Sequence, residues 1–502
     1  MSSSKTLRFI AIVIALLAVI GLLMPEKGIN LFGLHLYYPS PQAIMGDNRQ
    51  PEVDFAAESE QPALNAMQDT LNYLYHRRDS SDLRFWLPSH DYFDSFWETV
   101  ATARDHKRTV RILHYGDSQI ELDHISSRLR AYMQHTFGGG GPGMLPARPI
   151  TPVVTVRQST NGPLVHLASF GDSLATRSHG NYGPMMQCFR LEGGEANISI
   201  KTSTGSRIDD AVKQFARVRL IANNRGTLNV ELTDMADKKN PASLSTSSHG
   251  VVALDWNADS TTEAFRMRIK GNADLYALLV DADSGGIAVD NIPMRGCSGG
   301  QFTLVSEELL SAAYSQMDIG LIILQFGGNS VPYIKTESQI STYCNTIGKQ
   351  IDHVHRCCPS AKILFIGPSD MSHRAHGEIA TYAALPALVD SLAATATAHG
   401  AAYWSIYHAM GGLNSMQGWT RQGLAGKDYI HFSQKGADLM GDRLAAAFAD
   451  NYALYQLEKR IAVEKHHAEE VQKSLEKDSK ATRHKAKTKA TKRKNRRKGG
   501  RR

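Results

Sequence analysis

The sequence lacks the common signatures of nucleotide and metal sites. Its 502 residues include only five cysteines, and their spacing fits no metal-binding motif. It also contains no Walker loop, no dinucleotide fingerprint and no internal repeat. The odd number of cysteines leaves at least one thiol unpaired within the chain, and the sequence does not choose among the pairs. These absences exclude the classes of nucleotide-binding and zinc-binding proteins that are recognised by such sequence motifs.

Acidic residues are absent from the last 24 positions, Ser479 to Arg502, which hold thirteen Lys and Arg. The formal net charge of the chain is +7, and removing these thirteen cations leaves −6 on the rest. A low-complexity run of one charge predicts a disordered tail that binds anionic envelope polymers or lipid head groups. A solvated tail that aids solubility is the alternative. We do not expect nucleic acid binding, because no recognition fold or aromatic interleaving accompanies the run.

Polar residues are absent from residues 9–24, which follow Lys5 and Arg8. No small-x-small cleavage site precedes Pro25. The pattern predicts an uncleaved signal anchor that holds residues 9–24 in the inner membrane and leaves the rest of the chain at its periplasmic face. Signal cleavage, followed by release into the periplasm, is the alternative.

The remaining chain is too long for one core, and its patterning changes twice. Strand-like and helix-like runs alternate at its beginning and toward its end, which predicts a mostly parallel sheet with helices on both faces. The middle has short alternating runs separated by turn residues, which predicts a β-sandwich. The expected divisions are a signal anchor (1–25), a tether (26–90), a first catalytic segment (91–143), an inserted β-sandwich (144–285), a second catalytic segment (286–452), and a polar helix with the basic tail (453–502).

Three segments carry residues suited to nucleophilic catalysis. An apolar run ends in a Gly-Asp-Ser turn at Ser118, and a helical pattern follows it. A second buried-strand run ends in Gly-Gly-Asn at Asn329. Near the end of the α/β pattern, Asp428 precedes His431 by three residues, so one turn can hold the carboxylate against the imidazole. We therefore expect Ser118 as nucleophile, His431 as its base and Asp428 as the group that orients the base.

A second Gly-Asp-Ser-Leu sequence occurs at Gly171 to Leu174. The residues after Ser173 include Gly, Asn and Pro, which favour a loop over a helix. A serine there would lack the helix N-terminus that we expect after Ser118. We therefore assign the nucleophile to Ser118 and not to Ser173.

These segments resemble the conserved blocks of the SGNH (GDSL-type) hydrolase family. Ser118 matches the block I serine, and Asn329 matches the block III asparagine. The segment Gly296-Cys297-Ser298-Gly299 is similar to block II, and Asp428 with His431 matches block V. The resemblance implies that the Ser118 and Gly299 N–H groups and the Asn329 side chain form the oxyanion hole.

Within this family the chain most resembles bacterial peptidoglycan O-acetylesterases, through residues 137–143, 403–412 and 419–436. The resemblance implies an SGNH-like three-layer α/β sandwich with an inserted carbohydrate-binding-module-like jelly roll. It also implies a serine esterase that removes O-acetyl groups from an envelope glycan, peptidoglycan above others, with no metal or organic cofactor. Ser330 departs from the family pattern, which often has an acidic residue after the asparagine, and leaves the substrate open. The alternatives are a glycan O-acetyltransferase with the same triad and a non-catalytic envelope-binding protein.

Overall fold

The structure is a computed structural model that describes residues 29–31, 34–36, 55–171, 180–236, 241–282, 285–375 and 377–499. The predicted signal anchor and Ser173 lie outside these residues. Within the described ranges, no helix combines the length and apolar character that crossing a membrane requires. The chain divides into two compact units, Met1–Gln68 with Ala462–Arg502, and Asp69–Ile461. All catalytic candidates belong to the second unit.

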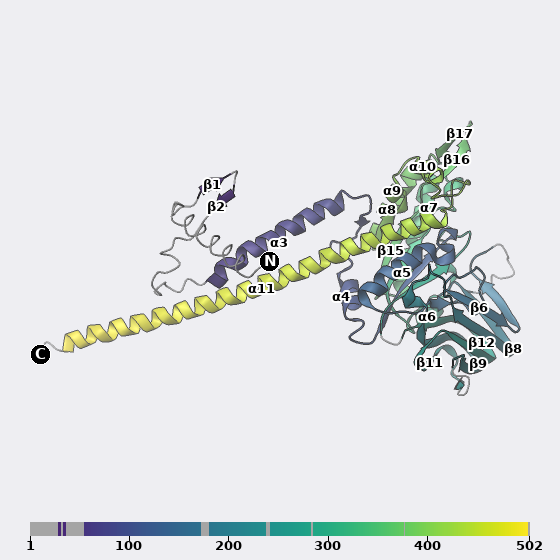
Figure 1. The fold of residues 1–502 in the computed structure, drawn as a ribbon, viewed down its shortest axis with the longest axis horizontal. Helices are drawn as coiled ribbons and strands as arrows, with labels where there is room; N and C mark the ends of the chain where they lie inside the picture. Colours follow the sequence, from purple (N-terminus) through teal and green to yellow (C-terminus); the bar gives the residue numbers. More distant parts are fainter. Residues whose placement is uncertain are drawn as a thin grey trace, which may run out of the picture. The chain divides into compact units, whose positions relative to one another are not determined.

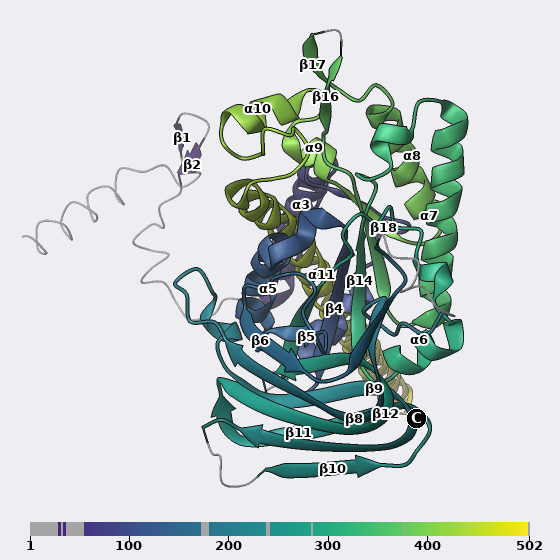
Figure 2. The same ribbon diagram turned by 90° about the vertical axis from the view of Figure 1, so that its right-hand side faces the viewer.

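A six-stranded sheet forms the centre of the second unit (Figures 1 and 2). Its order is β13-β4-β14-β15-β18-β3; the first five strands are parallel, and β3 pairs antiparallel with β18. This arrangement confirms the predicted mostly parallel sheet. The strand bounds, in chain order, are β3 Phe85–Trp86, β4 Thr109–Gly116, β13 Gly286–Pro293, β14 Asp318–Gln325, β15 Lys362–Gly367 and β18 Ala402–Ser405.

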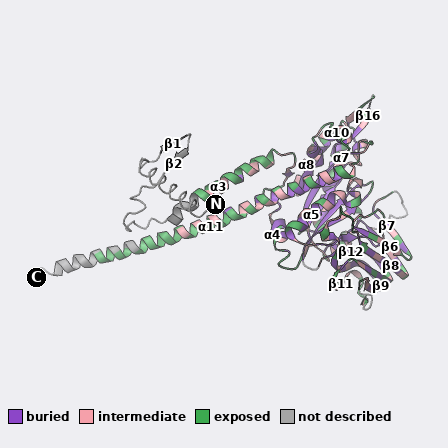
Figure 3. Cartoon of the chain, viewed as in Figure 1, coloured by how far each residue is buried: buried purple, intermediate pink, exposed green. Residues whose placement is uncertain are grey.

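Helices cover both faces of this sheet because its strands are apolar on both sides. In β14, Ile322 and Leu324 face one apolar cluster, while Leu321 and Ile323 face another. Figure 2 shows α7 and α8 on one side of the sheet and α5 on the other, and Figure 3 shows the buried strands between them. The layers form the predicted three-layer sandwich. The first face carries α6 Glu307–Tyr314, α7 Glu337–Cys357 and α8 Leu385–Ala398; the second carries α4 Asp94–Thr102, α5 His124–Phe137 and the start of α11 Gln434–Gly499.

The inserted region contains a second sheet with its own apolar core. All eight strands of this region, which the sequence predicted as a β-sandwich, are joined by hydrogen bonds into one sheet. The reason is the length of β9, which pairs with β11 along its first half and with β10 further on. The strands are β5 Gly143–Leu145, β6 Val156–Asn161, β7 Leu164–Ala168, β8 Gln187–Thr202, β9 Phe215–Asp234, β10 Ala242–Thr246, β11 Gly250–Thr262 and β12 Ala264–Asp281.

The inserted sheet packs directly on the α/β region. On β12, Leu275 and Leu278 face the core of the inserted sheet, while Tyr276 and Leu279 join a cluster shared with the central sheet. Contacts therefore place the inserted sheet and the α/β region in the same compact unit. The predicted domain boundaries and the carbohydrate-binding role of the insertion stay predictions.

Helix α11 differs from the sequence prediction. We expected a polar helix and then a disordered basic tail, but α11 continues without a break through Gly499. The run from Ser479 is rich in Lys, Arg and Ala, which are strong helix formers, and it contains no proline. The prediction of disorder, which was based on charge composition alone, is therefore wrong for the backbone of residues 479–499.

Helix α3 spans Phe55–Asp79. All five cysteines are buried, and none of them forms a disulfide bond in the described part of the chain. The remaining elements are β1 Ile29–Leu31, β2 Leu34–Leu36, β16 Ser372–Ala375, β17 Glu378–Thr381, α9 Ile406–Met410, α10 Ser415–Arg421 and the 3-10 turns η1 Ser118–Asp123, η3 Asp210–Val212, η4 Phe302–Leu304 and η5 Val331–Tyr333.

Candidate active site

The carboxyl ends of β4 and β14 place Ser118 and Asn329 near each other. The two strands are parallel neighbours, and Gln325 at the end of β14 is opposite Gly116 at the end of β4. Each candidate residue follows its strand by two to four positions. Open α/β sheets bind their ligands at this edge.

The segment after β4 is a tight 3-10 turn and not the α-helix that the sequence predicted. The Asp117 carboxylate accepts a hydrogen bond from the Gln119 N–H at 2.9 Å, which begins η1 at Ser118. Leu122 and Asp123 both have φ of +60°, and this left-handed backbone separates η1 from α5. Ser118 therefore has the backbone donors of a short turn, and α5 begins only at His124.

Ser118, His431 and Asp428 form a hydrogen-bonded chain. Ser118 Oγ lies 3.0 Å from His431 Nε2, and His431 Nδ1 lies 2.8 Å from Asp428 Oδ2. With Nδ1–H donating to the carboxylate, Nε2 is free to accept the serine proton. This is the geometry of a nucleophile, a base and an orienting acid, and the three residues are those that the sequence predicted.

The loop that carries the histidine is fastened to the serine turn by Gln119. Its side-chain Nε2 donates to the Ile430 carbonyl at 2.8 Å, and its Oε1 accepts from the Phe432 N–H at 3.4 Å. These contacts bracket His431 from both sides. Sequence reasoning missed Gln119, although it directly follows the nucleophile.

The ionisation of Asp428 is set by opposing effects. Partial burial opposes ionisation, but hydrogen bonds from the His431 ring and from the Ile430 and His431 N–H groups outweigh it and lower the pKa of this carboxyl. The carboxylate therefore stays charged at neutral pH. A charged Asp428 stabilises the imidazolium that forms when His431 takes a proton.

Asp117 is buried beside the same site. Burial raises the pKa of its carboxyl to about 6, against the lowering effects of the Gln119 N–H, the nearby His431 and the Asn329 amide. The residue is only 4% exposed. Its carboxyl accepts a hydrogen bond from Asn329 Nδ2 at 3.0 Å, so it positions the amide that was predicted to bind the oxyanion.

The Asn329 amide has a second partner. Its Nδ2 also donates to the Cys297 carbonyl at 3.0 Å, so both of its hydrogens are given to protein acceptors. Donation to an oxyanion requires one of them to turn toward the substrate. Gly299 lies in the same loop as Cys297, at a φ of +92°, but it does not line the cavity at Ser118. Its role as an oxyanion donor stays a prediction.

The cavity at Ser118 has a volume of about 180 Å³. Pockets for drug-sized ligands occupy about 300 to 1,000 Å³, so this one suits a small acyl group. Ser118, Asn329 and His431 line it together with apolar side chains. These are Phe326, Pro332, Tyr333, Pro368, Met371, Ile406 and Ile430.

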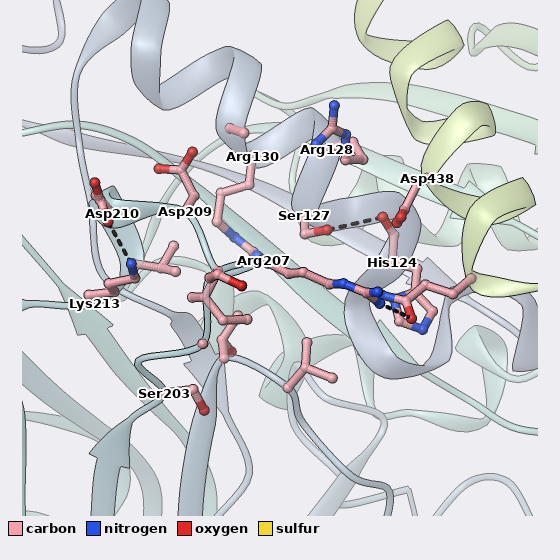
Figure 4. Close-up of a pocket in the computed structure, with 18 of the residues that line it drawn as sticks. His124, Ser127, Arg128, Arg130, Ser203, Arg207, Asp209, Asp210, Lys213 and Asp438 are labelled. Carbon is pink, nitrogen blue, oxygen red and sulfur yellow. Dashed lines mark hydrogen bonds and ion pairs between the residues drawn. The ribbon is translucent and has the colours of Figure 1, made fainter.

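A larger groove, of about 1420 Å³, lies between α5, the start of α11 and the loop before β9 (Figure 4). Many of the residues that line it are polar or charged, and Arg207 from the inserted region donates to Gln434 Oε1 at 2.8 Å. Lys213 and Asp210 form an ion pair in its wall. The triad does not line this groove, so the groove is separate from the chemical site.

Two of the comparisons with known proteins found matches to this chain. Residues 259–439 match the model of the GDSL-like Lipase/Acylhydrolase family. The match includes Gly299, Asn329, Asp428 and His431, while Ser118 precedes it in the chain. The comparison with curated proteins finds no match.

Among solved structures, one described as a peptidoglycan O-acetylesterase "in action" is similar at 22% identity, with a TM-score of 0.59. The match covers 72% of this chain and 96% of that one. A family two carbohydrate esterase from Clostridium thermocellum matches at 10% identity with a TM-score of 0.24, covering 58% of this chain and 100% of that one. An acetyl xylan esterase from Butyrivibrio proteoclasticus matches at 8% with a TM-score of 0.23, covering 60% and 99%. The first of these shows a shared fold.

Proposed function

We propose that the chain is a carboxylic ester hydrolase of the GDSL-like type that removes O-acetyl groups from a cell-envelope glycan, peptidoglycan in the first instance. The observation that carries this proposal is the Ser118–His431–Asp428 chain, of which Ser118 and His431 line a cavity of about 180 Å³. An acetyl group fits such a cavity. The peptidoglycan O-acetylesterase of similar fold supports the choice of glycan.

In the first half of the reaction, Ser118 attacks the acetyl carbonyl. His431 Nε2 takes the hydroxyl proton as Oγ bonds to the carbonyl carbon, and Asp428 holds the imidazolium that results. The carbonyl oxygen becomes an oxyanion, which the Ser118 and Gly299 N–H groups and the Asn329 amide are expected to bind. Losing one such donor typically costs about 3 kcal/mol of transition-state stabilisation.

Collapse of this intermediate breaks the bond between the carbonyl carbon and the sugar oxygen. His431 returns its proton to that oxygen, and the sugar leaves with a free hydroxyl. A water molecule then attacks the acetyl group on Ser118, with His431 again taking a proton. Acetate leaves, and the proton passes from His431 to Ser118 Oγ, which restores the enzyme.

The test of this proposal is acetate release from O-acetylated peptidoglycan by the chain and by Ser118→Ala. The substitution should lower the turnover rate by roughly 10⁴-fold or more, because only the oxyanion donors and substrate binding remain. The variant should unfold at the same urea concentration as the unsubstituted chain. Ser173→Ala is the matched control and should keep the rate within about twofold.

Substantial turnover by Ser118→Ala would remove the assignment of the nucleophile. If the chain releases acetate faster from acetylated xylan than from O-acetylated peptidoglycan, its substrate is a glycan other than peptidoglycan. Transfer of acetyl groups to added unacetylated glycan, in place of acetate release, would make the chain a transferase with the same acetyl-enzyme.

The proposed location follows from the two ends of the chain. Residues 9–24 would anchor it in the inner membrane with the esterase at the periplasmic face, or a signal would be cleaved and the chain released there. The cations of residues 479–502 would attract anionic envelope polymers. Both assignments are motivated by composition alone.

A further inference from the structure

Tyr333 has an unusual position for a large aromatic side chain. It is 77% exposed, the highest value among the exposed large hydrophobic residues in the described ranges of the chain. It also lines the cavity that contains Ser118 and His431. Single exposed hydrophobic residues are common on protein surfaces, so the position at the cavity is the informative observation.

The backbone holds this ring in place. Tyr333 ends the 3-10 turn η5, and its N–H donates to the Ser330 carbonyl at 3.0 Å. The residues that anchor the turn are buried, with Val331 at 1% and Ile334 at 6% exposure. Pro332, which lies between Val331 and Tyr333, has its φ angle fixed by its ring. The backbone that carries the exposed ring is therefore a short, anchored turn.

For the reaction, the acyl carbonyl must lie at Ser118 Oγ and the leaving oxygen must remain within reach of His431. Tyr333 lines the same cavity as these two residues and is exposed, so the alcohol portion of the ester can reach its ring. The aromatic face of Tyr333 can therefore contact the alcohol portion of the ester.

We propose that Tyr333 is the platform on which the pyranose ring of the substrate stacks while Ser118 attacks its acetyl ester. The axial C–H bonds of a gluco-configured pyranose form an apolar face that fits the negative face of an aromatic ring. The tyrosine hydroxyl meets solvent or the sugar's own hydroxyls. This inference rests on the proposed function, and it names the residue of the site that selects a sugar ester over other acetates.

The test compares two acetyl esters that share the acyl group and differ in the alcohol. For the 6-O-acetyl ester of N-acetylglucosamine, Tyr333→Ala should lower kcat/KM about tenfold, mostly through a higher KM. For ethyl acetate, which has no ring to stack, kcat/KM should stay within about twofold. Tyr333→Phe and Tyr333→Trp keep an aromatic face and should keep the activity on the sugar ester.

Tyr73→Ala is the matched control, because Tyr73 is 66% exposed on α3 and does not line the cavity. It should change neither substrate's kcat/KM. Equal losses on both esters by Tyr333→Ala, or no loss on either, would overturn the platform. If the unsubstituted chain cleaves ethyl acetate but no sugar acetate, the proposed function itself fails, which is a different result from either of these.

Discussion

At the scale of residues, the site depends on the two neighbours of Ser118 in the chain. Asp117 holds the start of η1 and the Asn329 amide, while Gln119 holds the backbone on both sides of His431. One three-residue turn therefore positions the nucleophile, the base and a candidate oxyanion donor together. Distances of 3.0 and 2.8 Å along the triad are the result.

The buried Asp117 carboxyl should make stability depend on pH. Its pKa is about 6 in the folded chain and near the ordinary 3.8 when unfolded, so the folded state holds this proton more tightly. Raising the pH from 4 to 7 ionises a carboxyl that burial disfavours, and this residue alone should then reduce the free energy of unfolding by about 2 kcal/mol. Urea unfolding at several pH values measures the change.

Asp117→Asn keeps one acceptor oxygen at this position but cannot ionise. The difference in unfolding free energy between this variant and the unsubstituted chain should grow in the variant's favour from pH 4 to pH 7. A difference that stays constant over this range would show that Asp117 titrates normally.

At the scale of elements, β4 connects the central sheet with the inserted one. Arg111 on β4 is 2% exposed and forms two hydrogen bonds, each of 2.8 Å, with Asp290 on β13. A third bond, of 2.7 Å, reaches Asp281 at the end of β12. Asp290 also accepts from the Met144 N–H on β5. This buried network fixes the inserted sheet beside the strand that leads to Ser118.

Arg111→Met should be strongly destabilising, because it leaves two carboxylates buried without a cation. We expect a loss of about 3 to 5 kcal/mol in the free energy of unfolding, measured by urea denaturation. Arg108→Met is the matched control. Its ion pair with Asp318 is about half exposed on the arginine side, so its loss should cost no more than about 1 kcal/mol. Similar costs for the two variants would contradict the role of the buried network.

At the scale of the whole chain, the catalytic unit lies in sequence between two segments of different composition. Residues 9–24 are apolar, and residues 479–502 are cationic without any acid. Helix α11 belongs to the catalytic unit up to Ile461 and to the other compact unit beyond it. Both segments lie far in sequence from the triad residues.

Removing either segment should change where the protein binds and not how fast it works. Truncation after residue 478 removes thirteen cations and should therefore weaken sedimentation with purified cell wall. The measurement is made at low salt, because exposed charges are screened beyond about 8 Å at physiological ionic strength. Truncation of residues 1–25 should move the protein from the membrane fraction to the soluble fraction. Both variants should keep the full rate on ethyl acetate. Unchanged sedimentation and fractionation would assign no binding role to these ends.

The sequence by itself determined the features that depend on local spacing. Continuous apolar strand-like runs that alternate along the chain with helix-like runs predicted the parallel sheet and its two helical layers. Strands buried on both faces are apolar at nearly every position, so the pattern can be recognised locally. The three-residue spacing of Asp428 and His431 fits one turn, and the Gly-Asp-Ser turn at Ser118 follows a buried-strand run. These patterns predicted the triad only in combination and with the family resemblance.

Only the tertiary structure decided the contacts between distant segments. Ser118 and His431 are 313 residues apart, and so are Gln119 and Phe432. Strand pairing over long separations joined the inserted strands into one sheet, and no local pattern encodes which strand pairs with which. The exposure of Tyr333 at the cavity has the same origin, because burial depends on what the rest of the chain leaves uncovered.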